Sequence, residues 1–189
     1  VRSSAASDVY KRQILNLLEA KNLYKSFGNI NAVSDISISL NVGEVIGFLG
    51  PNGAGKSTTM KMLTGFLEAD SGSIEIKKID LSKDPINAKS IIGYLPEGAP
   101  SYSDMTVKSF LYFVGKMRGL KDELLEKRLE IMLKDINLSE VQNQIIETLS
   151  KGYKRRVGIA QALIHDPDIL ILDEPTDGLD PNQKFEMRK

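Results

Sequence analysis

A glycine-rich stretch, Gly50-Pro51-Asn52-Gly53-Ala54-Gly55-Lys56-Ser57-Thr58, constrains this chain more than any other part of it. Its glycines let the backbone curl tightly, often through positive φ, so that consecutive N–H groups point inward. The pattern G-x-x-x-x-G-K-[ST] then places a lysine and a hydroxyl directly after this curl. A helix that begins near Lys56 would add the positive end of its dipole. Together these features predict a loop that binds phosphate groups.

The residue types in this loop suit a nucleoside triphosphate. Lys56 can reach the β- and γ-phosphates, and the Ser57 hydroxyl can ligate Mg²⁺. The flanking sequence predicts a buried strand over Glu44–Leu49 and a helix over Thr59–Leu63, which is the strand–loop–helix context that the motif requires. A chance glycine-rich turn would have no reason to sit in that context, so we predict nucleotide binding.

Two apolar strands end in carboxylates. The segment Ile169–Leu172 is followed by Asp173 and Glu174, and Ile91–Leu95 is followed closely by Glu97. An acidic residue at the end of a strand next to the phosphate-binding loop can hold Mg²⁺ through water, and Asp173 fits that role. Glu174 could polarise the attacking water as a general base. A strand with charged ends by chance is the alternative, which the phosphate-binding loop makes weak.

A helical block lies between these strands. Thr106 is a plausible N-cap for a first helix, with Phe110, Phe113, Val114 and Met117 on one face and Gly119 as its stop. Asp122 can cap a second helix, whose buried side is predicted to consist of Leu124, Leu125, Leu129, Met132, Leu133 and Ile136. Internal packing explains these apolar stripes better than an exposed groove for a partner, which stays the alternative.

A further helix is predicted from Ser150, as its N-cap, to about Ile164. Its N-terminus would suit an anion. The basic run Lys154-Arg155-Arg156 is more typical of a solvated face than of a phosphate clamp. The only histidine, His165, lies in a loop and is interpreted as structural or inert.

Composition excludes several classes of function. The 25 basic and 25 acidic side chains balance, so the sequence shows no electrostatic footprint for nucleic acid. Cysteine is absent, which removes disulfides and thiolate metal sites. No apolar run approaches the ~20 residues of a membrane helix, so a membrane role would have to act through a partner.

The N-terminal residues 1–13 resemble a non-native tail. They are small and polar at first, and residues 8–13 resemble the translation of a transposon-type sequencing adapter. A natural disordered terminus is the alternative. The structured pattern begins at Ile14.

Taken together, these motifs resemble the ATPase subunit of ABC transporters, from about Leu15 to the end of the chain. Residues 50–58 look like the Walker A loop and residues 169–174 like the Walker B strand. Residues 149–153 align with the LSGGQ signature, so that Ser150 and Gly152 would face a phosphate. Phe27 lies where the family places an adenine-stacking aromatic, although an ordinary core aromatic is an equal alternative from the residues alone. Asp180 occupies the position of the D-loop aspartate.

The resemblance implies an α/β fold: a P-loop NTPase (RecA-like) core with a small antiparallel β lobe and a helical subdomain near residues 100–149, within an ABC ATPase domain over 14–189. It implies ATP and Mg²⁺ as ligands, with Ser57, Glu97 and Asp173 around the metal. The implied partners are an integral membrane transporter subunit and a second ABC ATPase subunit, in a homo- or heterodimer. The implied location is the cytoplasmic face of the cell membrane, as a peripheral protein.

Two departures from the family pattern narrow the hypothesis. Glu97 stands where most members carry the Q-loop glutamine, and a carboxylate can reach Mg²⁺ or water but cannot donate a hydrogen bond. Lys151 and Tyr153 replace a glycine and a glutamine of the signature. This combination looks like bacterial exporters with a separately encoded membrane subunit, including the gliding-motility and drug-efflux types.

The leading hypothesis is therefore an ATP-hydrolysing subunit that powers such an exporter. The alternative is a soluble ABC ATPase that acts in translation or DNA maintenance. A small-molecule kinase would explain the phosphate-binding loop but not the signature helix.

The resemblance also implies a switch histidine on a further strand after the Walker B strand, and His165 lies before that strand. The first residue is Val1 rather than methionine. We therefore expect a chain that is truncated at its C-terminus and inactive by itself.

Overall fold

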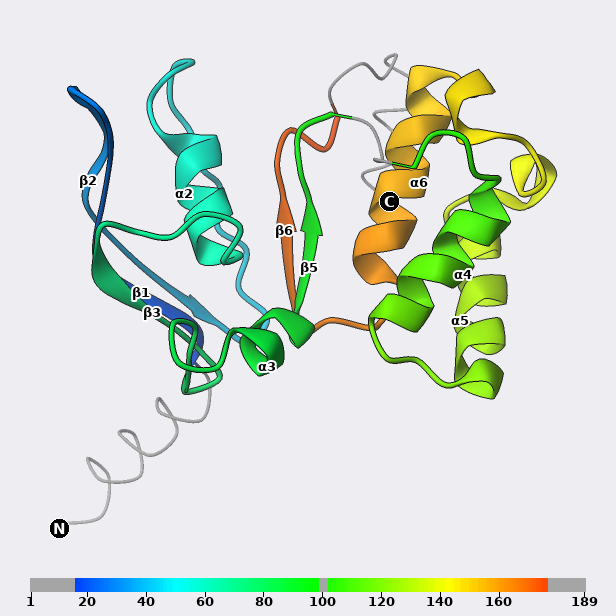
Figure 1. Ribbon diagram of the computed structural model, residues 1–189, viewed down its shortest axis with the longest axis horizontal. Coiled ribbons are helices and arrows are strands. Elements are labelled where there is room, and N and C mark those ends of the chain that lie inside the picture. Colours follow the sequence, from blue (N-terminus) through cyan, green and yellow to red (C-terminus); the bar gives the residue numbers. More distant parts are fainter. Residues whose placement is uncertain (1–15, 99–101, 177–189) are drawn as a thin grey trace, which may run out of the picture. The chain divides into compact units, whose positions relative to one another are not determined.

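The computed structural model describes residues 16–98 and 102–176 (Figure 1). Two compact units follow one another along the sequence, Val1–Ile91 and Ile92–Lys189. The first is built on an antiparallel sheet, and the second on helices and a parallel strand pair. The tail predicted over residues 1–13 lies outside the described residues.

An antiparallel sheet with strand order β2-β1-β3-β4 organises the first unit. Its strands are β1 (Asn16–Phe27), β2 (Ile30–Asn41), β3 (Ser71–Ile76) and β4 (Ile79–Asp80). One set of apolar side chains from β1 and β3 is buried, as expected for strands with one covered face: Leu18, Ala20, Leu23, Ile74 and Ile76. The predicted antiparallel lobe is thus present.

Two described helices belong to the same unit. Helix α2 (Lys56–Leu63) begins inside the glycine-rich stretch and buries Thr59, Met62 and Leu63. Helix α3 (Pro85–Ser90) starts with a proline, and the Asp84 carboxylate at its N-cap accepts a hydrogen bond from the Asn87 N–H at 3.3 Å. The predicted helix after the glycine-rich stretch is therefore present, and it begins at Lys56 as expected.

The strand predicted over Glu44–Leu49 was wrong for this structure. These residues form no strand, and the side chains of Val45 and Leu49 are 94% and 96% exposed. A strand exists only through hydrogen bonds to a neighbour. No described strand pairs with this segment, so its apolar residues stay in the open.

A parallel pair of strands lies in the second unit. Strand β5 (Ile92–Leu95) pairs with β6 (Ile169–Leu172) in a register that places Leu95 opposite Leu172. Both strands match the predicted ones to within a residue. Because the strands are parallel and in register, the segments that follow them leave from the same edge.

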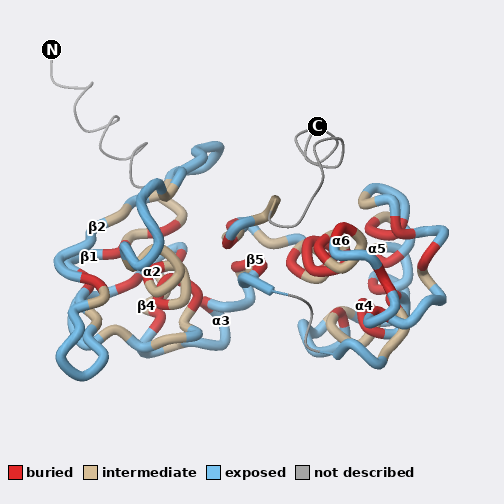
Figure 2. Tube along the Cα trace, turned by 90° about the horizontal axis from the view of Figure 1, so that it is seen from above, coloured by how far each residue is buried: buried red, intermediate tan, exposed pale blue. Residues whose placement is uncertain are grey.

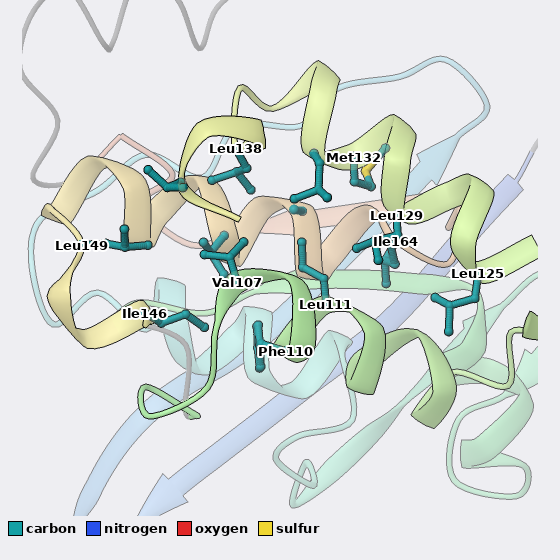
Figure 3. Packing of buried hydrophobic residues seen from close by; sticks show 14 residues of the cluster. Val107, Phe110, Leu111, Leu125, Leu129, Met132, Leu138, Ile146, Leu149 and Ile164 are labelled. Atoms are coloured by element: carbon teal, nitrogen blue, oxygen red, sulfur yellow. The ribbon is translucent and has the colours of Figure 1, made fainter. Parts of the chain in front are cut away.

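Three helices supply most of the core of the second unit: α4 (Val107–Met117), α5 (Asp122–Asp135) and α6 (Lys151–Leu163). Short 3₁₀ turns lie at Ser139–Val141 and Ile146–Thr148. Figure 3 shows the buried side chains meeting between these helices, from Val107 and Phe110 to Leu129 and Ile164. Buried positions run along most of α6 (Figure 2). Among the described residues, no helix combines the length and apolar character that crossing a membrane requires.

Both predicted N-caps with hydroxyl side chains are confirmed. Thr106 accepts from the Ser109 N–H at 3.2 Å, and Ser150 accepts from the Tyr153 N–H at 3.4 Å. The cap predicted at Asp122 was wrong, because Lys121 is the N-cap of α5 and Asp122 is its first residue.

The predicted apolar faces need two corrections. Met117 and Leu124 are 73% and 50% exposed. In α4 the buried face is instead formed by Val107, Phe110, Leu111 and Gly115, which have the i, i+3, i+4 spacing of one helical stripe. Met117 lies at the edge of that stripe, seven residues after Phe110, and it is exposed as the last residue of α4.

The contact between β5 and α6 depends on glycine. A Cβ on Gly93 would collide with the Ala162 carbonyl oxygen and lie 2.8 Å from Cγ of Pro167. A Cβ on Gly158 of α6 would lie 2.6 Å from Cδ1 of Leu95. The strand and the helix therefore approach each other through positions without side chains.

We predict that Gly93→Ala lowers the free energy of unfolding by about 1–3 kcal/mol, the usual cost of overpacking a close-packed contact. The measurement is thermal melting of the full-length protein. Gly47→Ala is the control, because a Cβ there meets nothing within 4 Å. Equal melting temperatures for Gly93→Ala and the parent would contradict the predicted close approach.

His165 provides a pH prediction. Its Nε2 lies 3.1 Å from the Ile92 carbonyl oxygen, while Nδ1 is buried without a hydrogen-bond partner among the described atoms. Burial lowers the pKa of His165, and the charges of Arg118 and Arg128 lower it further, against the opposing effects of the Ile92 carbonyl and Asp166. The imidazole is therefore neutral in the folded chain, with Nε2–H donating.

The pKa of His165 in the folded chain lies below the ordinary value of ~6.5. As the pH falls past that value, the unfolded chain therefore binds more protons than the folded chain does. The free energy of unfolding should therefore decrease between about pH 7.5 and 5.5. The His165→Gln variant should lose part of this slope, since its amide can still donate to the Ile92 carbonyl but does not titrate. Melting temperatures across this range check the prediction, and identical slopes would contradict it.

Candidate nucleotide-binding site

The glycine-rich loop has the backbone conformation that its sequence predicts. Gly53 and Gly55 both have φ of 82°, in the left-handed region that glycine adopts at little cost. At Gly55 a side chain is excluded for a second reason, because a Cβ would overlap the carbonyl oxygen of Ala32 in β2. Gly55 is also the N-cap of α2, so the loop runs straight into the N-terminus of a helix. This arrangement suits an anion.

The lysine of the loop is held by the loop itself. The Lys56 ammonium donates hydrogen bonds to the carbonyl oxygens of Gly50 and Pro51, both at 2.8 Å. The following residues Ser57 and Thr58 are half-buried in the first turn of α2, which contains no acidic residue. The loop residues 51–54 are exposed. The loop therefore presents a cation, hydroxyls and backbone to the surface together.

Phe27 ends β1 in the same unit, and its side chain is 50% exposed. The exposed ring does not fit the alternative of an ordinary core aromatic. The Lys25 ammonium lies 5.8 Å from the ring centroid and is paired with Asp70 at 2.6 Å. The hydrogen bond from Lys25, followed by that from the Ser26 N–H, lowers the pKa of Asp70. The role of Phe27 against adenine stays a prediction.

The second unit brings three predicted carboxylates to one edge. Glu97 follows β5, and Asp173 and Glu174 follow β6 directly. The Asp173 N–H donates to the Leu95 carbonyl at 2.9 Å, which extends the pairing of the two strands by one residue. The loops that carry these acidic residues therefore start side by side.

Asp173 differs from the other two carboxylates in its environment. It is 3% exposed, and its Oδ2 is buried without a hydrogen-bond partner among the described atoms. A buried carboxylate oxygen without a partner is unfavourable unless a cation or an ordered water completes it. The donor chemistry thus fits Mg²⁺ or a water bound to it. In the described part of the chain, no cluster of three or more acidic, histidine or cysteine side chains could hold a metal alone.

Glu97 and Glu174 are exposed. Glu174 also has φ of 48°, which for a residue with a side chain costs about 1–3 kcal/mol. Such strain persists only where neighbouring contacts hold the backbone, and it is common at functional sites. The strained backbone thus sets the direction in which the predicted base leaves the strand.

Tyr94 is one neighbour of this edge that the sequence did not predict. Its hydroxyl is buried without a hydrogen-bond partner in the described structure. Desolvation raises the pKa of Tyr94, and the negative charges of Asp173 and Glu97 raise it further. The phenol is therefore neutral and can donate.

Arg155 is the other residue that the sequence analysis missed. Interpreting residues 154–156 as a solvated face was wrong for Arg155, which is 6% exposed. Helical spacing could have found it, because Gly152, Arg155, Ile159 and Ala162 fall on one buried stripe of α6. Its guanidinium donates to carbonyls of both loops that carry the acidic residues.

The predicted signature residues lie at the start of α6. Ser150 is exposed and caps the helix, and Gly152 is buried in its first turn. The helix N-terminus predicted there is therefore present. Asp180 lies outside the described residues.

Within the described residues, the predicted sites thus form two groups. The phosphate-binding loop and Phe27 belong to the first unit. Glu97, Asp173, Glu174 and the start of α6 belong to the second.

Comparison with known proteins shows the family in which these features occur together. The family model described as "ABC transporter" matches residues 33–177. The chain belongs to the ABC transporter ATP-binding family. The fold class predicted above, a P-loop NTPase core with a small antiparallel β lobe and a helical subdomain, is confirmed by solved ATP-binding cassettes. One, an ATP binding subunit of an ABC transporter, is 32% identical with a TM-score of 0.82, over 90% of this chain and 71% of that one.

Among the curated relatives, the linearmycin resistance ATP-binding protein LnrL of Bacillus subtilis is 43% identical over 168 residues, which cover 89% of this chain and 54% of LnrL. The lipopolysaccharide export system ATP-binding protein LptB of Escherichia coli is 37% identical over 175 residues, 91% of this chain and 73% of LptB. The chain spans about half the length of the first curated relatives, 54% and 56%.

For this ABC cassette, we predict that Glu97→Gln retains most of the affinity for Mg·ATP. Both side chains offer an acceptor oxygen, and the exposed carboxylate gains little from its charge in water. The dissociation constant should change by less than roughly threefold, which corresponds to about 0.7 kcal/mol. Titration of the full-length variant and parent with Mg·ATP measures this. Loss of binding in the variant would mean that the carboxylate charge is required.

Proposed function

We propose that this chain is the ATP-hydrolysing subunit of an ABC exporter, acting as a dimer on a separate membrane subunit. The observation that carries the proposal is the phosphate-binding loop, in which Lys56 lies at the N-terminus of α2 beside a backbone opened by Gly53 and Gly55. The family match over residues 33–177 supports assigning this loop to a protein class that uses ATP.

In this proposal the triphosphate lies in the loop of residues 50–58. The backbone N–H groups and the helix dipole bind its negative charge, and Lys56 exchanges its contacts with loop carbonyls for contacts with the β- and γ-phosphates. Phe27 stacks on the adenine ring. Mg²⁺, when bound, neutralises charge that develops on the phosphate oxygens. Ser57, Asp173 and Glu97 would hold the ion directly or through water, with Asp173 Oδ2 as an oxygen that has no partner among the described atoms.

Glu174 is the proposed general base. Its place two residues after β6, next to Asp173, suits a group that polarises water near the γ-phosphate. Lys56 and Ser57 would bind the substrate in the ground state as well as the transition state. Glu174 would act mainly on the water, so binding and turnover should respond to different substitutions.

A second ATPase subunit would complete the site. The N-terminus of α6, with Ser150 and Gly152, would face the γ-phosphate held by the other subunit, and Asp180 would lie at the same interface. Residues 100–149, which include α4 and α5, would form the helical subdomain of the ABC domain over 14–189 and relay motion to the membrane subunit. ATP would stabilise the closed dimer, and hydrolysis would release it.

The exporter role rests on two supports. The combination of Glu97 with Lys151 and Tyr153 resembles exporters of the gliding-motility and drug-efflux types. The relatives LnrL and LptB are named for resistance to linearmycin and for export of lipopolysaccharide, and neither name comes from translation or DNA maintenance. The soluble alternative is therefore not favoured. A peripheral position on the cytoplasmic face follows from the exporter role.

We predict that Glu174→Gln lowers kcat for ATP hydrolysis by at least about 100-fold, the contribution typical of a general base. ATP affinity should remain, and the ATP-bound dimer should accumulate. Lys56→Ala should instead weaken ATP binding by roughly 10- to 100-fold, because it removes charged hydrogen bonds to phosphate.

The measurements are steady-state hydrolysis, ATP titration and size-exclusion chromatography of the full-length protein with Mg·ATP. Unchanged hydrolysis in Glu174→Gln would remove Glu174 from its role as base. Recovery of the protein only with ribosomes or DNA, and never with a membrane subunit, would contradict the transporter role.

A further inference from the structure

Arg155 lies in α6 on the buried stripe that includes Gly152 and Ile159. Burying a cation costs free energy unless its N–H groups all find hydrogen-bond acceptors. The guanidinium carries five N–H groups in a rigid fork, and here five main-chain carbonyls accept from it. Its position is therefore determined by backbone from other parts of the unit.

These carbonyls come from two loops. Nη1 donates to Pro96 at 2.9 Å and more weakly to Gly98 at 3.4 Å, both in the loop after β5. Nη2 donates to Asp173 and, at 2.5 Å, to Glu174, and Nε donates to Pro175 at 3.2 Å. One side chain thus joins the loop after β5 to the loop after β6.

The acceptors flank the acidic residues. The hydrogen-bonded carbonyls of Pro96 and Gly98 lie on either side of Glu97. Those of Asp173 and Pro175 lie on either side of Glu174, whose own carbonyl is also an acceptor and whose φ is 48°. The guanidinium therefore holds the backbone at the points from which both exposed carboxylates project.

We propose that Arg155 is a positioning residue for ATP hydrolysis, which fixes Glu97 and Glu174 relative to each other and to the helix that begins at Ser150. The inference rests on the proposed function for the roles of the two glutamates. The clamp itself is a property of the second unit. A group that acts on the attacking water has to be held closely, because a misplacement of about 1 Å can cost roughly 100-fold in rate.

The chemistry of the guanidinium decides what can replace it. Lysine keeps the charge, but its ammonium is a point donor with three N–H groups and cannot span five carbonyls on two loops. Arg155→Lys therefore removes the clamp without removing the positive charge. These hydrogen bonds of Arg155 go to the two acidic loops and not to the phosphate-binding loop. In the phosphate-binding loop, Lys56 is held by carbonyls of the loop itself. Arg155→Lys should therefore leave ATP binding unchanged.

The matched control is Arg128→Lys. Arg128 in α5 also joins two segments of this unit, since it donates to the Ile164 carbonyl at 3.3 Å and pairs with Asp166 at 2.6 Å. Those partners lie at the other end of α6 from Ser150. Arg128→Lys should therefore affect stability without affecting the acidic loops.

The test uses the full-length protein and two readouts. For Arg155→Lys we expect kcat to fall roughly 10- to 100-fold, while the dissociation constant for ATP changes less than about threefold. Hydrogen–deuterium exchange should become faster in peptides covering residues 93–98 and 170–176, where the Asp173 N–H is bonded to Leu95 in the parent. Arg128→Lys should keep kcat within about twofold of the parent and leave exchange in these two segments unchanged.

The two readouts separate this inference from the proposed function. A parent protein that does not hydrolyse ATP overturns the proposed function, and the exchange measurement still decides whether Arg155 holds the two loops. Unchanged exchange or unchanged kcat in Arg155→Lys overturns the positioning role. Equal losses of kcat in Arg155→Lys and Arg128→Lys also overturn it, because they would indicate general destabilisation.

Discussion

The parallel pairing of β5 with β6 is the constraint on which the second unit depends. Its register sets Leu95 opposite Leu172, so two segments far apart in sequence leave the sheet at the same level. The Asp173 N–H bonds to the Leu95 carbonyl and carries this order one residue further. A shift of the register by one residue would turn the side chains of a strand to its other face. The grouping of the acidic residues is thus a result of backbone pairing.

The close approach of α6 to β5 connects this strand pairing with the acidic loops. Gly93 and Gly158 leave no side chain at the contact, so the helix lies near enough for the Arg155 guanidinium to reach backbone beyond both strand ends. The hydrogen bonds also offset the cost of burying a cation. Small residues in one place thereby permit a long, charged residue in another. The contact between α6 and β5 therefore determines both the local packing and the geometry of the acidic loops.

Local chemistry made part of this structure predictable. The glycine-rich loop, the N-caps Thr106 and Ser150 and the strands ending before Glu97 and Asp173 all follow from residues close in sequence, and the structure has them. The burial of Arg155 was missed because its basic neighbours suggested a solvated face, and only helical spacing could have corrected this. The segment Glu44–Leu49 shows a different limit. Its apolar residues predict a strand, but a strand forms only when a partner pairs with it, and no described strand pairs with this segment.

The β1–β2 hairpin has a further consequence for ligand size. Phe27 pairs with Ile30 at one end of the hairpin. Close by on β2, the carbonyl oxygen of Ala32 lies against Gly55 of the phosphate-binding loop. The positions of the aromatic ring and of the phosphate-binding backbone are therefore both set by the β1–β2 hairpin. In the proposed function, this hairpin would set the distance between the binding positions of the base and of the phosphate groups. Ligands would then be selected by their length as well as by their charge.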